Sequence, residues 1–257
     1  MMLRPFYYDF HIHSALSPCA DDDMTPNDIV SMAQLCGLDM IAVTDHNTFA
    51  NVEPVIKAAE EKGVTVIPGA EIETREEVHV ICLFPSLRAA LGFEAELSPL
   101  FSAEKNRADI FGQQLLYDEH DRVYGEIDRM LMAPADISFD ALHSLVGKYG
   151  GSFIPAHIDR GSYSVLSNLG SLPPDLPLPA LEVSLHGLET GFVKRNANSF
   201  PKSMFIFSSD AHHLWDIAEK NHFLLLPENS PQAAISALNL EPRALALRWP
   251  LRRGGVL

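Results

Sequence analysis

The sequence lacks the features that mark secreted and membrane proteins. Its three cysteines, Cys19, Cys36 and Cys82, are too few and too odd in number for a framework of disulfides. No apolar stretch reaches the roughly 18 residues that a membrane-spanning helix needs. The first residues, from Met1 to Pro5, also lack the apolar core of a signal peptide. We therefore expect a cytoplasmic protein without a membrane partner.

Basic residues are scarce as well. The chain has 19 lysines and arginines against 34 aspartates and glutamates, which gives a formal net charge of −15. An acidic surface is poorly suited to broad, non-specific contact with nucleic acid, so we expect no binding of long nucleic acid. The charge does not exclude a small phosphorylated substrate, because bound divalent cations reverse the field at one point.

The order of expected elements alternates between strand and helix along the whole chain. With 257 residues and 47% hydrophobic content, the chain is long enough for one substantial core. Short apolar runs predict strands, and periodic stripes with capping residues predict helices. The expected strands cover residues 6–13, 40–44, 64–67, 78–84, 153–157, 181–185 and 205–208, with an eighth at 224–226. The expected helices cover 25–36, 52–62, 86–109 and 138–149, and a hairpin covers 114–125.

This alternation predicts an α/β fold in which parallel strands form a single barrel. The pattern weakens between residues 86 and 140, which we interpret as an irregular insertion within one domain spanning 1–257. The four prolines of residues 173–179 predict an irregular connector.

Histidines and carboxylates recur where the expected strands end. His11 and His13 are two residues apart, so a strand would point both imidazoles the same way. In a parallel α/β protein the strand ends converge on one face, where they bring distant residues together. Eight side chains follow this pattern: His11, His13, His46, Glu71, His79, His157, Asp210 and His212. Eight imidazoles and carboxylates are too many for one ion, which predicts two or three divalent ions of zinc, manganese or iron.

The motifs that carry these residues resemble the polymerase and histidinol phosphatase (PHP) domain family. The ordered series runs from His11-Ile12-His13-Ser14 through Thr44-Asp45-His46, Gly69-Ala70-Glu71 with His79, and Pro155-Ala156-His157 to Ser209-Asp210-Ala211-His212. The resemblance implies a distorted (β/α)7 TIM-like barrel of parallel strands, with a trinuclear metal site at their C-terminal ends. It also implies a stand-alone metal-dependent phosphoesterase.

The resemblance distributes the eight side chains over three ions. His11, His13, Glu71 and Asp210 would hold the first, and Glu71 would bridge to a second that is also held by His79 and His157. His46 and His212 would hold the third. The sequence departs from the family pattern after the first strand, where Cys19 and Asp21 both lie within reach of the third ion. A thiolate favours zinc and a carboxylate tolerates manganese or iron, and both alternatives remain open.

Two further residues are candidates for binding the substrate. Arg160 follows His157 by three residues and could pair with a phosphate oxygen, although a surface ion pair is the alternative. His186 follows another strand and could contact substrate or orient a ligand. His46, His157 and His212 are the candidates for protonating the leaving alcohol.

The function that these residues predict is hydrolysis of a small phosphomonoester, such as a nucleotide or histidinol phosphate, by a metal-bound hydroxide. No serine or cysteine nucleophile paired with a base stands out. The alternatives are a nuclease that acts on short oligonucleotides, an amidohydrolase-type enzyme that cleaves C–N bonds, and a non-catalytic metal-binding barrel. The oligomeric state does not follow from the sequence.

Overall fold

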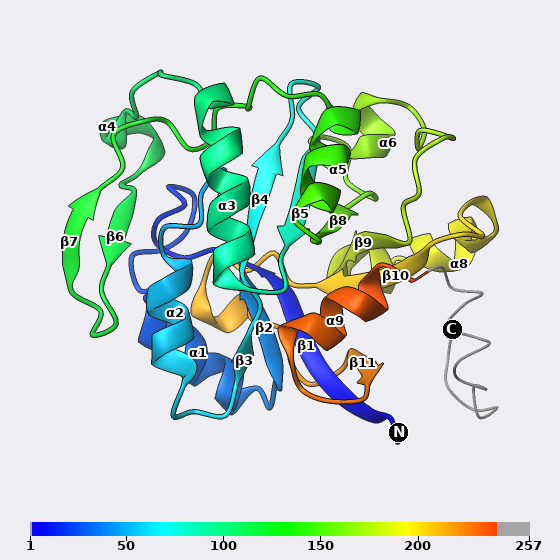
Figure 1. Ribbon diagram of the computed structural model, residues 1–257, viewed down its shortest axis with the longest axis horizontal. Coiled ribbons are helices and arrows are strands. Elements are labelled where there is room, and N and C mark those ends of the chain that lie inside the picture. Colours follow the sequence, from blue (N-terminus) through cyan, green and yellow to red (C-terminus); the bar gives the residue numbers. More distant parts are fainter. Residues whose placement is uncertain (1, 241–257) are drawn as a thin grey trace.

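The computed structural model describes residues 2–240, and its strands lie at the centre with helices around them (Figure 1). The first half of the chain begins with the predicted alternation of strand and helix. Its elements are β1 (Arg4–Ile12), α1 (Pro26–Leu35), β2 (Met40–Val43), α2 (Val52–Ala59), β3 (Thr65–Val66), β4 (Gly69–Glu73), β5 (His79–Leu83), α3 (Leu87–Leu97), η1 (Ser98–Leu100), α4 (Ala108–Phe111), β6 (Leu115–Tyr117) and β7 (Val123–Glu126). Residues 69–73, however, form a strand that the sequence did not predict. The expectation of one helix over 86–109 is also wrong, because α3 ends at Leu97, shortly before Pro99, and only short helical turns follow.

The second half contains the remaining strands, which are separated by shorter helices. These elements are α5 (Phe139–Lys148), β8 (Ser152–Pro155), α6 (Val165–Asn168), β9 (Ala180–Ser184), α7 (Leu185–Glu189), α8 (Phe192–Asn196), η2 (Ala197–Ser199), β10 (Met204–Ser208), η3 (Leu214–Asp216), β11 (Phe223–Leu226) and α9 (Pro231–Leu238). The Pro-rich segment 173–179 contains no helix or strand, as expected.

Capping residues start the helices where the sequence predicts them. The Thr25 side chain accepts from the Asp28 backbone N–H at the start of α1, and the Ser138 side chain accepts from Ala141 at the start of α5. The expected hairpin is also present, since β6 and β7 pair antiparallel across the turn at residues 118–121. It projects from one side of the molecule in Figure 1.

The α/β fold is confirmed, but the closed parallel barrel is not. The hydrogen-bonded strands of the described chain form four sheets, in the orders β11-β1-β2-β3, β4-β5-β8, β10-β9 and β6-β7. Strand β5 runs antiparallel to both β4 and β8, and β11 runs antiparallel to β1. The expectation of uniformly parallel strands is therefore wrong for these two.

A shared apolar layer nevertheless joins strands from three of the sheets. Side chains of β1, β2, β5, β8, β9, β10 and β11 meet in one buried cluster that includes Phe10, Met40, Ile81 and Ile154. Helix α9 contributes to the same cluster, and so it closes one end of the strand assembly. The burial of this apolar surface holds the strands together. It thereby fixes the relative positions of their opposite ends, where the histidines lie.

A register shift in β1 separates this core from the histidines. The pairing of β1 with β2 is irregular between Asp9 and Ile12. Phe10 packs in the inner cluster, whereas Ile12 packs in a different one against the helices α1 and α2. A bulge of this kind redirects side chains, so His11 and His13 turn into the site.

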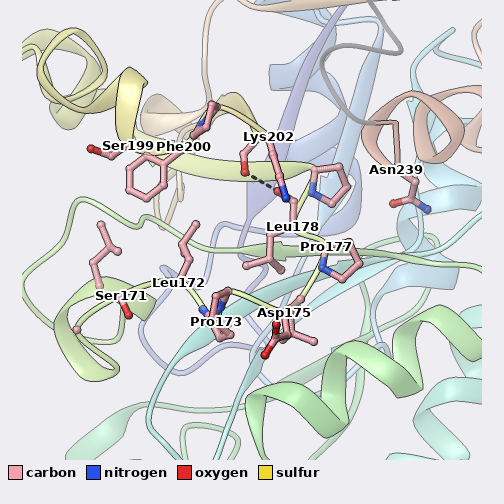
Figure 2. Close-up of a pocket in the computed structure, with 17 residues that line it drawn as sticks. Ser171, Leu172, Pro173, Asp175, Pro177, Leu178, Ser199, Phe200, Lys202 and Asn239 are labelled. Carbon is pink, nitrogen blue, oxygen red and sulfur yellow. Dashed lines mark hydrogen bonds between the residues drawn. The ribbon is translucent and has the colours of Figure 1, made fainter.

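A cavity of about 700 Å³ lies at the other ends of β9 and β10, away from the histidines (Figure 2). The Pro-rich connector and residues 199–203 form its walls, and Leu172, Leu178 and Phe200 contribute apolar surface. Ser203 Oγ donates to the Leu178 carbonyl oxygen at 2.6 Å, which ties the two walls together. Its charged lining residues are Asp175 and Lys202, and none of the predicted site residues lines it.

Candidate metal centre

The strands bring all eight predicted side chains to one end of the molecule. His11 and His13 come from the end of β1, His46 follows β2, and Glu71 lies within β4. His157 follows β8, and Asp210 and His212 follow β10. His79 departs from the expected pattern because it begins β5 rather than ending it. Since β5 is antiparallel to β4, its first residue lies at the same end as the last residues of its neighbours.

Glu71 lies at the centre of the group. Its side chain is 1% exposed, and its two oxygens contact five imidazoles from four segments of the chain. Oε1 lies 2.8 Å from Nδ1 of His79 and 3.3 Å from Nε2 of both His11 and His157. Oε2 lies 3.1 Å from Nδ1 of His46 and 3.4 Å from Nε2 of His13. Both oxygens are therefore available to neighbouring ions.

The charge on Glu71 is favoured by these neighbours. Burial alone would raise the pKa of its carboxyl group, but the imidazoles of His79 and His11 lower it well below its ordinary value. The pKa of Asp210 is also lowered, because His11 and His13 outweigh its burial. Both carboxylates are thus charged at neutral pH, as metal ligands must be.

His11, His13 and Asp210 form one group of donor atoms. Nε2 of His11 and Nε2 of His13 both lie 3.1 Å from Asp210 Oδ1, and the two nitrogens lie 3.2 Å from each other. The pKa of His13 is lowered well below its ordinary value by burial and by the nearby His212. A neutral imidazole offers a free lone pair, so this arrangement fits a divalent cation.

Cys19, one of the two residues between which the sequence left the choice open, joins a second group of donor atoms. The Cys19 Sγ atom and one ring nitrogen each of His13, His46 and His212 all lie within 4.8 Å of one another. Burial raises the pKa of the thiol, but hydrogen bonds with His212 and His46 outweigh it and lower the pKa to about 7. Asp21 lies outside this group and pairs with Nδ1 of His213 at 2.6 Å.

Buried polar groups that lack a partner also fit bound ions. Within residues 2–240, Nδ1 of His157 is buried without a hydrogen-bond partner. A polar atom left in that state costs free energy, and metal coordination would offset the cost. The backbone at His157 has a φ of 29° and that at Asp210 a φ of 55°. Strained conformations of this kind cluster at functional sites.

Buried carboxylates and hydroxyls hold the imidazoles in place. Glu182, on β9, lies 3.0 Å from Nδ1 of His11 through its Oε2 and accepts from the backbone N–H of His157. Ser17 Oγ lies 3.0 Å from Nδ1 of His13 and donates to Asp45. Asp45 therefore acts on the imidazole of His13 through Ser17.

The two predicted substrate residues occupy different surroundings. The Arg160 guanidinium is 47% exposed and pairs with Oδ2 of Asp210 at 2.7 Å, so it lies at the edge of the site. His186 is exposed on the short helix α7, and none of its side-chain contacts in residues 2–240 reaches the other site residues. The roles of both residues stay predictions.

Two residues near the site, Glu182 and His213, do not stand out in the sequence. Glu182 was overlooked because a single acidic residue within an apolar strand gives no motif, although a charged residue at a buried strand position is itself unusual. His213 was overlooked because it directly follows the ligand candidate His212.

The fold and the site together define an α/β protein with side chains suited to divalent cations. The sequence model of the PHP domain family matches residues 9–158, which is more than half of the chain. The chain belongs to the PHP domain family.

Individual relatives add detail. Over 79 residues the chain is 35% identical to a 5'-3' exoribonuclease of Haemophilus influenzae, and this segment is 30% of the chain and 28% of that protein. The chain thus matches less than a third of that relative's length. Endonuclease Q of Pyrococcus furiosus shares the fold with a TM-score of 0.70 at 17% identity, over 92% of this chain and 56% of that one. A putative metal-dependent phosphoesterase from Bifidobacterium adolescentis superposes with a TM-score of 0.52 at 17% identity, over 94% and 96% of the two chains.

The expectation that long nucleic acid is excluded is wrong. Endonuclease Q in complex with a 27-mer duplex shares this fold with a TM-score of 0.60 at 18% identity, over 82% of this chain and 50% of that one. The deduction failed because net charge is an average over the whole surface. The field at a site is set by the groups and ions within it.

The structure describes no helix in residues 2–240 that is long and apolar enough to span a membrane.

Proposed function

We propose that this chain is a metal-dependent hydrolase of phosphate esters. The observation that carries the proposal is the convergence of six imidazoles, one thiol and two carboxylates, of which Glu71 offers both of its oxygens. Membership of the PHP domain family supports it.

The donor set accommodates two to three divalent ions of zinc, manganese or iron. In this proposal His11, His13 and Asp210 would hold one ion, His79 and His157 would hold a second, and Glu71 would serve both. Cys19, His46 and His212 would hold a third, with His13 in the same group of donor atoms. Bound ions of this kind neutralise the charge of a phosphate and acidify water, so that it attacks at neutral pH.

Side chains of this protein would bind the phosphate and protonate the leaving oxygen. Arg160 can exchange Asp210 for a phosphate oxygen, because its guanidinium is half exposed and already lies at the edge of the site. Among the three candidates for protonating the leaving oxygen, His212 is the most accessible. Its side chain is 27% exposed, against 7% for His46 and 2% for His157.

Two substrate classes fit the site. A small phosphomonoester is the first, because a clustered set of ions binds a terminal phosphate tightly. A phosphodiester of a nucleic-acid strand is the second, and the names of the exoribonuclease and endonuclease relatives favour it. The two classes differ in the number of phosphate oxygens that are esterified, one in a monoester and two in a diester.

The test is a comparison of substrates on protein reloaded with manganese, zinc or iron. We expect release of inorganic phosphate from adenosine 5'-monophosphate, or shortening of an end-labelled oligonucleotide, only after metal is added. Glu71→Gln keeps the side-chain shape and removes its charge, so activity should fall by orders of magnitude. Glu96→Gln changes an exposed carboxylate on α3 and serves as the control. Failure to hydrolyse any phosphate ester in any metal form would refute the proposal.

A further inference from the structure

A large aromatic side chain lies exposed on the turn that follows the metal ligand candidate His212. Trp215, in η3, is 69% exposed, which is unusual for an indole of this size. Its ring stacks on the imidazole of His213, with centroids 4.6 Å apart and planes inclined by 7°. One face of the indole is therefore covered by His213.

The surroundings hold this pair of rings in position. Nδ1 of His213 pairs with Asp21, and the backbone N–H of Asp21 donates to the carbonyl oxygen of His212 at 2.9 Å. Leu214 packs against the core and Ile217 is buried, so the residues on both sides anchor the turn. Trp215 itself is directed outward between these two anchors.

The position of the pair places it beside the proposed reaction centre. Asp21 and His212 belong to the segments that also carry Cys19 and the end of β10, and these segments border the group of Cys19, His46 and His212. Trp215 follows His212 by only three residues. A substrate whose phosphate is bound by the ions would therefore have the Trp215 ring close by.

We propose that Trp215, backed by His213, is a stacking surface for the nucleobase of the substrate. The inference rests on the proposed function and narrows it to nucleotides and to the ends of single strands. Every base has a π-face, so stacking attracts a base without regard to charge.

Fluorescence tests the contact without requiring activity. The chain has two tryptophans, so Trp249→Phe leaves Trp215 as a single reporter. The probes are adenosine 5'-monophosphate, adenosine and ribose 5-phosphate, each titrated with and without zinc. We expect the monophosphate to quench Trp215 at low concentration with zinc, adenosine to quench it only at higher concentration, and ribose 5-phosphate to leave the emission unchanged.

Binding and kinetics of Trp215→Ala provide the second measurement. The Kd and KM for adenosine 5'-monophosphate should rise about 5- to 150-fold, the equivalent of the roughly 1–3 kcal/mol that stacking contributes per base. The values for ribose 5-phosphate should stay the same, and Trp215→Phe should recover most of the loss. Phe223→Ala serves as the control, because it removes another exposed aromatic side chain. Phe223 lies on β11, which pairs with the first half of β1, away from the site. This variant should change neither the Kd nor the KM for either phosphate.

The outcomes separate this inference from the function on which it rests. Absence of turnover on both phosphates and on an end-labelled oligonucleotide, in every metal form, would refute the proposed function, while the quenching experiment would still test the stacking surface. Turnover of both phosphates with no effect of Trp215→Ala would overturn the stacking surface alone. A concentration-dependent dimer that buries Trp215 in sedimentation experiments would overturn it as well, since the exposed indole would then be a contact between two copies.

Discussion

At the residue scale, the site depends on Glu182, a buried carboxylate that contacts a ligand candidate and is not a ligand candidate itself. Glu182 is 1% exposed, and both of its oxygens lie within 3.2 Å of Nδ1 of His11. This contact fixes the proton of His11 on Nδ1 and leaves Nε2 free to face Asp210 and His13. Because Glu182 also accepts from the His157 backbone, one carboxylate positions two members of the group.

We predict that Glu182→Gln weakens metal binding by roughly 10- to 100-fold, the usual cost of losing such a partner. The amide carries no charge, and when its oxygen takes the place of Oε2 to accept from the His157 N–H, its NH2 group takes the place of Oε1, 3.2 Å from Nδ1 of His11. Calorimetric titration with zinc measures the affinity, and the NMR signal of the His11 Nδ1 proton should move or broaden. Glu189→Gln alters an exposed carboxylate on α7 and should do neither. Unchanged affinity in Glu182→Gln would mean that packing alone orients His11.

Cys19 and Asp21 provide a second prediction at this scale. Cys19→Ser should lose about one equivalent of metal or bind it at least roughly 10-fold more weakly, a loss not smaller than that of an orienting partner. Asp21→Asn should keep full stoichiometry, because Asp21 pairs with His213 instead. Elemental analysis after dialysis gives the equivalents. Retention of all metal by Cys19→Ser would show that the thiol is not a ligand.

The same thiol should be reactive when metal is removed. With its pKa lowered to about 7 by His212 and His46, about half of Cys19 is thiolate at neutral pH. Alkylation of the metal-free protein should therefore be faster at Cys19 than at Cys36 or Cys82, whose thiols have raised pKa values. Zinc should protect Cys19, and mass spectrometry of the peptides measures both effects. Equal alkylation with and without zinc would contradict this.

At the scale of elements, the segment between residues 86 and 140 supports the loops that carry ligands. Asn47, next to His46, donates to the backbone oxygens of Leu131 and Ala133. Gly112 lies against the backbone of Pro18, next to Cys19. The interpretation of this segment as an insertion stays a prediction, but its contacts show that it braces the site.

Gly112 gives this bracing a test. Its φ of 101° is open to glycine alone, and a Cβ there would collide with the carbonyl oxygen of Pro18. Gly112→Ala should therefore lower the free energy of unfolding by about 1–3 kcal/mol and weaken metal binding at Cys19. Gly147→Ala, in α5 with open space around it, should instead be neutral or stabilising. Denaturant unfolding and metal titration measure the two effects, and equal behaviour of the variants would contradict the argument.

The elements also show where sequence reasoning reached its limit. Capping residues and periodicity are local signals, so helices such as α1 and α5 were predicted close to their observed bounds. The direction of β5 depends on how it pairs with β4 and β8, which no local pattern records. His79 nevertheless lies among the other ligand candidates, because reversing a short strand brings its first residue to the edge where parallel strands end. The contact between Glu182 and His11 joins residues 171 positions apart and could not be found in the same way.

At the scale of the whole molecule, bound ions should contribute much of the stability. The site buries Glu71, Asp210 and several imidazoles around mutually facing nitrogens. Ligands that bind only the folded state stabilise it by mass action. Because the strands that supply the ligands also share the inner core, stabilisation at the site should extend to the fold.

We predict that chelation lowers the melting temperature and that added zinc or manganese restores it. Free metal at 100 times its Kd adds about 2.7 kcal/mol, which corresponds to an increase of roughly 5–11 °C for a domain of this size. The increase should grow with pH through the neutral range, because His11 and His46 have raised pKa values and must lose their protons to bind metal. Differential scanning calorimetry measures the shift, and Glu71→Gln should show a smaller one at the same metal concentration. A melting temperature that does not respond to chelator or metal at any pH would mean that the six imidazoles and two carboxylates are held together by hydrogen bonds alone.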